Sequence, residues 1–222
     1  MNKVVSTGVF DRNGNDSISS QSFYATLTLS LLWGLIATAI IAYKAIEVKY
    51  MPGIGAIIVF GLIMPIIGIF IAVKSDNPAI SFLGYNLVIV PFGIIIGPSV
   101  NHYSPDVIRN AFGVTASITF FMGFMGTCFP NLFKNLGMPL FLALCGLVLV
   151  RIAQLFIPAL DLTIIDYIAA GIFSLYIAFD MYRASEMPKT IDNAIDLSVD
   201  LYLDVINLFL NILKIMGSKN ED

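Results

Sequence analysis

Charged side chains are scarce in this sequence. Only 12% of its 222 residues are Asp, Glu, Lys or Arg, whereas soluble globular domains average about 25%. Hydrophobic residues make up 58% of the chain, and the mean hydropathy is +0.87. A water-soluble fold needs more polar surface than this composition provides. The composition therefore excludes a soluble domain and indicates that lipid is the solvent.

Histidine and cysteine are almost absent. The chain has one histidine, His102, and two cysteines, Cys128 and Cys145. A structural zinc site takes four such ligands, so this class of site is excluded. Both cysteines stand in apolar surroundings, and we expect them to be small packing residues. The net charge of −3 contains no basic run, which argues against nucleic acid as a partner.

Long apolar runs fill the rest of the chain. Residues 1–22 are polar and contain no apolar core of a signal peptide, so we expect a polar tail there. We expect residues 23–217 to form a single membrane domain and residues 218–222 a short C-terminal tail. A membrane-spanning helix needs roughly 20 apolar residues. Seven segments qualify, which predicts an all-α integral membrane protein: 23–43, 51–73, 79–96, 110–130, 138–157, 164–181 and 194–215.

Proline and glycine mark two features inside these segments. Pro65 and Pro91 stand near the middle of the second and third segments. Each removes a backbone donor and favours a kink, so both are hinge candidates, with a purely shaping role as the alternative. Gly93 and Gly97 have the small-xxx-small spacing that lets two helix backbones approach closely.

The last segment carries an acidic stripe. Asp196, Asp200 and Asp204 recur every four residues, and Asn207 and Asn211 continue the stripe. An aspartate near the centre of a membrane helix costs about 2.5–3.5 kcal/mol on insertion scales. Two interpretations remain open. Either the other six helices surround this helix and the stripe faces an internal polar cavity, or the membrane segment begins near residue 199. Asp204 lies within the membrane in both.

The sixth segment supplies a second acid. Asp180 ends an apolar run and stands three residues before Arg183. It is either an end charge paired with Arg183 or a partner of Asp204 on the next helix. Two carboxyls that meet in a low dielectric share a proton. Deprotonated, Asp180 and Asp204 would offer oxygen ligands for weak, transient Ca²⁺ binding. An acidic pair inside a membrane is a candidate for ion or proton traffic.

A lone arginine, Arg151, interrupts the fifth segment. Three interpretations of it stay open. It pairs with an aspartate of the stripe, it pairs with Asp161 or Asp166, or its long side chain snorkels to the membrane surface.

Two stretches resemble a known family. Residues 198–213 (SVDLYLDVINLFLNIL) and 173–180 (FSLYIAFD), with weaker matches at 98–103 and 111–115, are similar to the transmembrane Bax inhibitor motif family in its compact bacterial form. The resemblance implies seven helices with the C-terminal helix central, surrounded by the other six. It further implies a pH-sensitive calcium leak gated by an aspartate pair that maps to Asp180 and Asp204, an N-terminus in the cytosol, and a bacterial inner membrane.

The sequence also departs from the family pattern. The segment 51–73 has no acidic residue, and Lys74 stands alone after it, so a further gating contact from this helix is in doubt. Asp200 stands where relatives usually have an uncharged residue, and Arg151 has no counterpart in the family pattern.

Two hypotheses of function follow. The first is a passive, proton-gated cation leak channel whose partners are the lipid bilayer, protons and Ca²⁺, with Ca²⁺ as permeant ion and no cofactor. The alternative is a non-transporting regulator of other membrane proteins in stress or protease regulation. An enzyme is not expected, because Asp180 follows Phe179 and Asp204 follows Leu203, which breaks the pattern of intramembrane aspartyl proteases.

Overall fold

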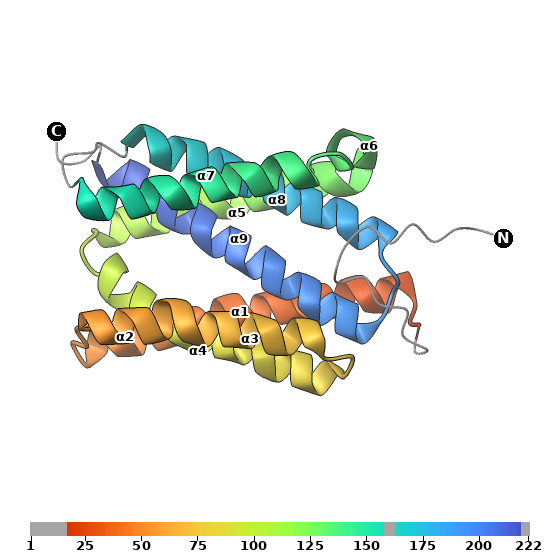
Figure 1. Cartoon of the computed structure of the whole chain (residues 1–222), viewed down its shortest axis with the longest axis horizontal. Coiled ribbons are helices and arrows are strands. Elements are labelled where there is room, and N and C mark those ends of the chain that lie inside the picture. The colour runs from red at the N-terminus through yellow and green to blue at the C-terminus, as the bar shows by residue number, and fades with distance from the viewer. Residues whose placement is uncertain (1–16, 158–162, 219–222) are drawn as a thin grey trace. The chain divides into compact units, whose positions relative to one another are not determined.

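The computed structural model describes residues 17–157 and 163–218, and these residues form helices joined by short connections, with no strand among them. In chain order the elements are α1 (Ser20–Glu47), α2 (Ile54–Ile58), the π-helical turn η1 (Val59–Ile63), α3 (Met64–Lys74), α4 (Pro78–Val100), α5 (Pro105–Cys128), α6 (Pro130–Phe133), α7 (Gly137–Phe156), α8 (Thr163–Glu186) and α9 (Ile191–Ser218) (Figure 1).

Six helices are long and apolar enough to cross a membrane within the described part of the chain. They correspond to the first six predicted segments, with α2, η1 and α3 forming one continuous span. The seventh segment is also helical, as α9, but aspartates at 192, 196, 200 and 204 set it apart in composition. The protein is therefore an all-helical, multi-pass membrane protein. That α9 is a seventh span stays a prediction.

Caps explain why several helices begin earlier than their apolar segments. Ser19 accepts a hydrogen bond at 3.0 Å from the backbone N–H of Ser22, so α1 starts before Phe23. Asn77 accepts from the N–H of Ala79 at 2.9 Å and fixes the start of α4. Such side chains satisfy the backbone donors that a helix leaves free at its N-terminus.

The chain divides into two compact units. Of the described residues, unit one comprises 17–102 together with 186–202, and unit two comprises 103–157, 163–185 and 203–218. Unit one thus contains α1 to α4 and the first part of α9, and unit two contains α5 to α8 and the second part. The division falls between Tyr202 and Leu203, within the continuous helix α9.

In unit one, α1 and α3 both pack against α4 (Figure 1). The prediction for Gly93 and Gly97 is confirmed, because a Cβ at Gly97 would stand 2.5 Å from the carbonyl oxygen of Ala42 in α1. Pro65 directly follows the start of α3, after the π-helical turn, and Pro91 is buried inside α4. A wide turn of this kind accommodates an interruption in the helical hydrogen bonds. A hinge motion at either proline stays a prediction.

In unit two, α5 and α7 both contact α8. A Cβ at Gly126 would overlap the backbone of Ala178, and Gly137 stands against the ring of Phe179. The expectation that Cys128 and Cys145 pack inside is wrong, because both side chains are exposed. Lipid is as apolar as a protein core, so apolar neighbours in sequence do not distinguish a buried cysteine from a surface one.

Candidate functional site

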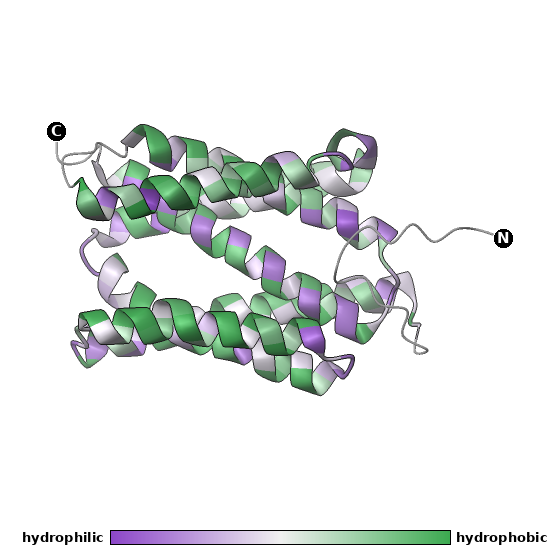
Figure 2. Ribbon diagram, viewed as in Figure 1, coloured by the Kyte–Doolittle hydropathy of each residue, from purple (hydrophilic) through white to green (hydrophobic). Residues whose placement is uncertain are grey.

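Hydrophilic residues recur along α9 (Figure 2). Asp196 is 9% exposed and Asp204 is 8% exposed, while Asp200 is partly exposed. Buried positions occur almost continuously from Asp192 to Leu213. Asp196 is thus covered by protein; whether it lies within the membrane or at its surface stays a prediction.

One acid of α9 was not among the predicted site residues. Asp192 is 6% exposed and accepts a 2.7 Å hydrogen bond from the hydroxyl of Ser81, which is fully buried in α4. Both residues belong to unit one. The spacing of four residues from Asp192 to Asp196 was a usable signal, because it extends the stripe by one turn. No sequence signal identified Ser81 as the partner.

Tyr202 anchors α9 within unit one. Its hydroxyl lies 2.6 Å from the hydroxyl of Thr38 in α1, and both side chains are buried. Its ring stacks on Phe92 at 6.4 Å between centroids and meets Tyr85 edge-on at 5.5 Å. These contacts hold the side chain of Tyr202 against α1 and α4, because a ring with neighbours on several sides admits one direction.

In unit two, Asp180 is buried and ion-paired. It is 2% exposed, and the guanidinium of Arg183, one turn further along α8, donates to its Oδ1 at 2.9 Å. The predicted pairing with Arg183 is therefore present, but Asp180 does not reach toward water. A carboxylate this buried needs a compensating charge, and Arg183 supplies it.

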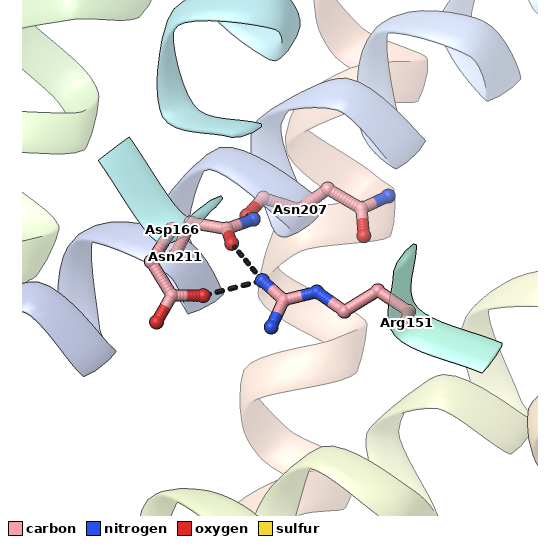
Figure 3. A network of polar contacts seen from close by, with 4 residues as sticks. All are labelled: Arg151, Asp166, Asn207 and Asn211. Atoms are coloured by element: carbon pink, nitrogen blue, oxygen red, sulfur yellow. Dashed lines mark hydrogen bonds and ion pairs between the residues drawn. The ribbon is translucent and has the colours of Figure 1, made fainter. Parts of the chain in front are cut away.

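Arg151 pairs with Asp166. Its guanidinium donates to Asp166 at the start of α8 and, at 3.0 Å, to the amide oxygen of Asn211 in α9 (Figure 3). The side chains of Arg151 and Asp166 are 28% and 12% exposed, and Asn211 is 6% exposed. Of the three open interpretations, pairing with Asp166 is the one present. Asp161, the other proposed partner, lies outside the described residues.

The two asparagines of the stripe also bond to their own helix. The amide nitrogen of Asn211 donates to the carbonyl of Asn207 at 2.7 Å, and that of Asn207 donates to Leu203 at 2.8 Å. These bonds fix the orientation of each amide group. The amide oxygen of Asn211 is consequently directed to Arg151 (Figure 3).

Asp180 and Asp204 both belong to unit two, on consecutive helices, and both are buried. Their direct pairing stays a prediction, as does the transient binding of Ca²⁺ between them. Within the described ranges, no group of three or more His, Cys, Asp or Glu residues is arranged to hold a metal ion.

Comparisons with known proteins identify the family of this chain. A sequence model of the family described as "Inhibitor of apoptosis-promoting Bax1" matches residues 20–221. The chain is 26% identical over 208 residues to an uncharacterized protein of Borreliella burgdorferi, covering 85% of this chain and 88% of that protein. It is 24% identical to the inner membrane protein YbhL of Escherichia coli K12, over 90% and 92% of the two chains.

A eukaryotic relative is also similar. The protein named Bax inhibitor 1 of Schizosaccharomyces pombe is 29% identical over 176 residues, which cover 76% of this chain and 61% of that protein. The family match extends from α1 to α9 and includes both stretches that carried the resemblance in the sequence. The chain therefore belongs to the Bax inhibitor-like family of multi-pass membrane proteins.

Proposed function

We propose that the protein is a pH-sensitive cation leak pathway, with Ca²⁺ as the permeant ion and Asp180 and Asp204 as its gate. The observation that supports this most is that two aspartates on consecutive helices of one unit are buried in an otherwise apolar protein. Acids in such positions are costly and mark ion or proton pathways by default. The proposal needs no cofactor and no catalytic step.

The gate depends on one proton. When the two carboxyls share it, a hydrogen bond holds α8 to α9. Arg183, which is paired with Asp180, balances the single negative charge of the state in which the proton is shared. When the proton leaves, the two carboxyls gain a second negative charge, repel each other and offer hard oxygen ligands to a cation. The remaining stripe residues, Asp196, Asp200 and Asn207, extend a polar path along α9, which in this proposal lies at the centre of seven spans.

Reconstituted protein tests the gate directly. Ca²⁺ flux into proteoliposomes is measured over a pH series for the wild type, Asp180→Asn and Asp204→Asn. The asparagine variants keep the shape of the side chain but cannot release the shared proton, so each should flatten the pH response. A pH response that is unchanged in Asp204→Asn would remove that residue from the gate.

A second candidate is a non-transporting regulator of other membrane proteins. The observation that favours it is the word "inhibitor" in the family description and in the name of the fission yeast relative. In that case the buried acids fasten helices together, and the exposed apolar faces bind partners. Stoichiometric co-purification of a membrane protein, with no Ca²⁺ flux from the purified chain at any pH, would favour this function over the first.

A further inference from the structure

We propose that Arg151 is a positioning residue for the gate, because its hydrogen bond to Asn211 holds the part of α9 that carries Asp204 in one rotational position. The proposal rests on the proposed function for its consequence, the closed gate. The contact itself is present in unit two and involves neither member of the gate pair.

Helix geometry connects the two positions. Asn211 stands seven residues, or about two turns, after Asp204, and a heptad drifts only about 20° around an α-helix. The two side chains therefore leave α9 from nearly the same face. A contact that fixes the rotation of α9 at Asn211 also fixes the direction in which Asp204 points.

The hydrogen bond between Arg151 and Asn211 joins two groups that are each held by a further bond, so it can fix the orientation of α9. The guanidinium of Arg151 is itself fixed, because it is paired with Asp166 of α8. The amide of Asn211 is fixed from the other side by its bond to the carbonyl of Asn207. Arg151 thus joins α7, α8 and α9 through one planar group (Figure 3). Arginine suits this role better than lysine, since its donors form a rigid fork.

The charges around Arg151 do not suggest that its bond to Asn211 serves to balance charge. Asp166 compensates the charge of Arg151. The other charged side chains of the described part of unit two are the exposed pair Asp106 and Arg109, the pair Asp180 and Arg183, and Lys134, Asp204 and Lys214. Asn211 adds no charge to the Arg151 pair. The bond of Asn211 to Arg151 therefore affects the orientation of α9, and losing it changes that orientation without changing the net charge.

Ca²⁺ flux, measured at the pH where the wild type is least permeable, tests whether Arg151 helps to keep the gate closed. Asn211→Leu removes the acceptor and leaves the pair of Arg151 with Asp166 intact. We expect its flux to rise about tenfold, the factor that corresponds to one hydrogen bond from a charged donor.

A matched control comes from unit one. The side chain of Asn86 also donates to the carbonyl four residues earlier, that of Phe82, and accepts from the indole N–H of Trp33. Asn86→Leu therefore removes the same two kinds of bond without touching Arg151, and its flux should match the wild type. Equal flux increases in Asn86→Leu and Asn211→Leu, or wild-type flux in Asn211→Leu, would overturn the proposal.

A second readout does not require flux. Thermal unfolding of Arg151→Met, Asn211→Leu and the double variant forms a double-mutant cycle. If the two residues act through one contact, the double variant loses clearly less in melting temperature than the two single variants lose together. Should Arg151→Met fail to accumulate, Arg151→Gln, which still offers Asp166 a donor, replaces it. Additive losses would refute the positioning role, whereas a coupled cycle without any wild-type flux would refute only the proposed channel.

Discussion

Several buried polar side chains of this protein have one specific hydrogen-bond partner. The change in stability on removing either partner can therefore be estimated. The hydroxyls of Thr38 and Tyr202 lie 2.6 Å apart and are both buried. A buried hydroxyl that loses its partner costs about 1–3 kcal/mol, while removing both partners is close to neutral. The asymmetry between single and double removal distinguishes a bonded pair from mere proximity.

Thr38→Val should lower the free energy of unfolding by about 1–3 kcal/mol, because the hydroxyl of Tyr202 then loses its hydrogen-bond partner. Adding Tyr202→Phe to that variant should recover part of the loss. Unfolding in detergent micelles by a denaturing surfactant measures both. A double variant less stable than Thr38→Val would contradict the hydrogen bond as the source of the effect.

Arg151 and Asp166 allow a similar comparison of charges. Removing one member of a fully buried ion pair costs about 3–5 kcal/mol, because it leaves an uncompensated charge. The side chains of Arg151 and Asp166 are 28% and 12% exposed, so Arg151→Met should destabilise the protein by less than this, and Arg151→Met with Asp166→Leu should regain part of the stability. The measurement is the melting temperature in the same detergent. An equal loss in the single and the double variant would show that packing, not charge, dominates at this position.

At the scale of helices, close approach of backbones decides which side chains are tolerated. Gly126 and Gly113 both lie in α5, but only Gly126 stands against another helix, at Ala178 of α8. A Cβ at Gly113 meets no atom within 4 Å. The two glycines thus share a helix and differ in their surroundings.

Gly126→Ala should destabilise the protein by about 1–3 kcal/mol, because α5 and α8 must move apart. Gly113→Ala is the matched control. It should be neutral or stabilising by up to about 1 kcal/mol, since alanine favours a helix more than glycine does. Thermal unfolding of the two variants side by side tests this, and a similar loss in both would rule out the contact as the cause.

The helices themselves follow from the apolar runs of the sequence, because a chain in lipid must satisfy its backbone internally. Their ends differ from the predicted ones by a few residues, since caps such as Ser19 and Asn77 lie outside the apolar runs. Asp180, Asp196, Asp200 and Asp204 were also predictable, because charge is rare in such segments, and so was the pairing of Asp180 with Arg183 one turn away. Partners on other helices could be proposed only as alternatives or not at all. The choice of Asp166 for Arg151 and of Ser81 for Asp192 depends on how helices are aligned with one another, which spacing within one helix does not specify.

At the scale of the whole molecule, the protein is a multi-pass membrane protein whose most acidic helix is also extensively buried. The acids of α9 occur in both units, with Asp192, Asp196 and Asp200 in unit one and Asp204 in unit two. A single helix thus bears four acids in an otherwise apolar protein. In the proposed function this is the reason for its composition, because an apolar helix would offer no path to a cation.

Ca²⁺ flux through purified protein in liposomes, followed from acidic to alkaline pH, tests the central proposal most directly. Flux through the wild type should be low while Asp180 and Asp204 share a proton and should rise as pH increases and the proton leaves. Both Asp180→Asn and Asp204→Asn should respond much less to pH. A wild-type protein whose flux is absent or independent of pH, or two variants that titrate as the wild type does, would contradict the gate.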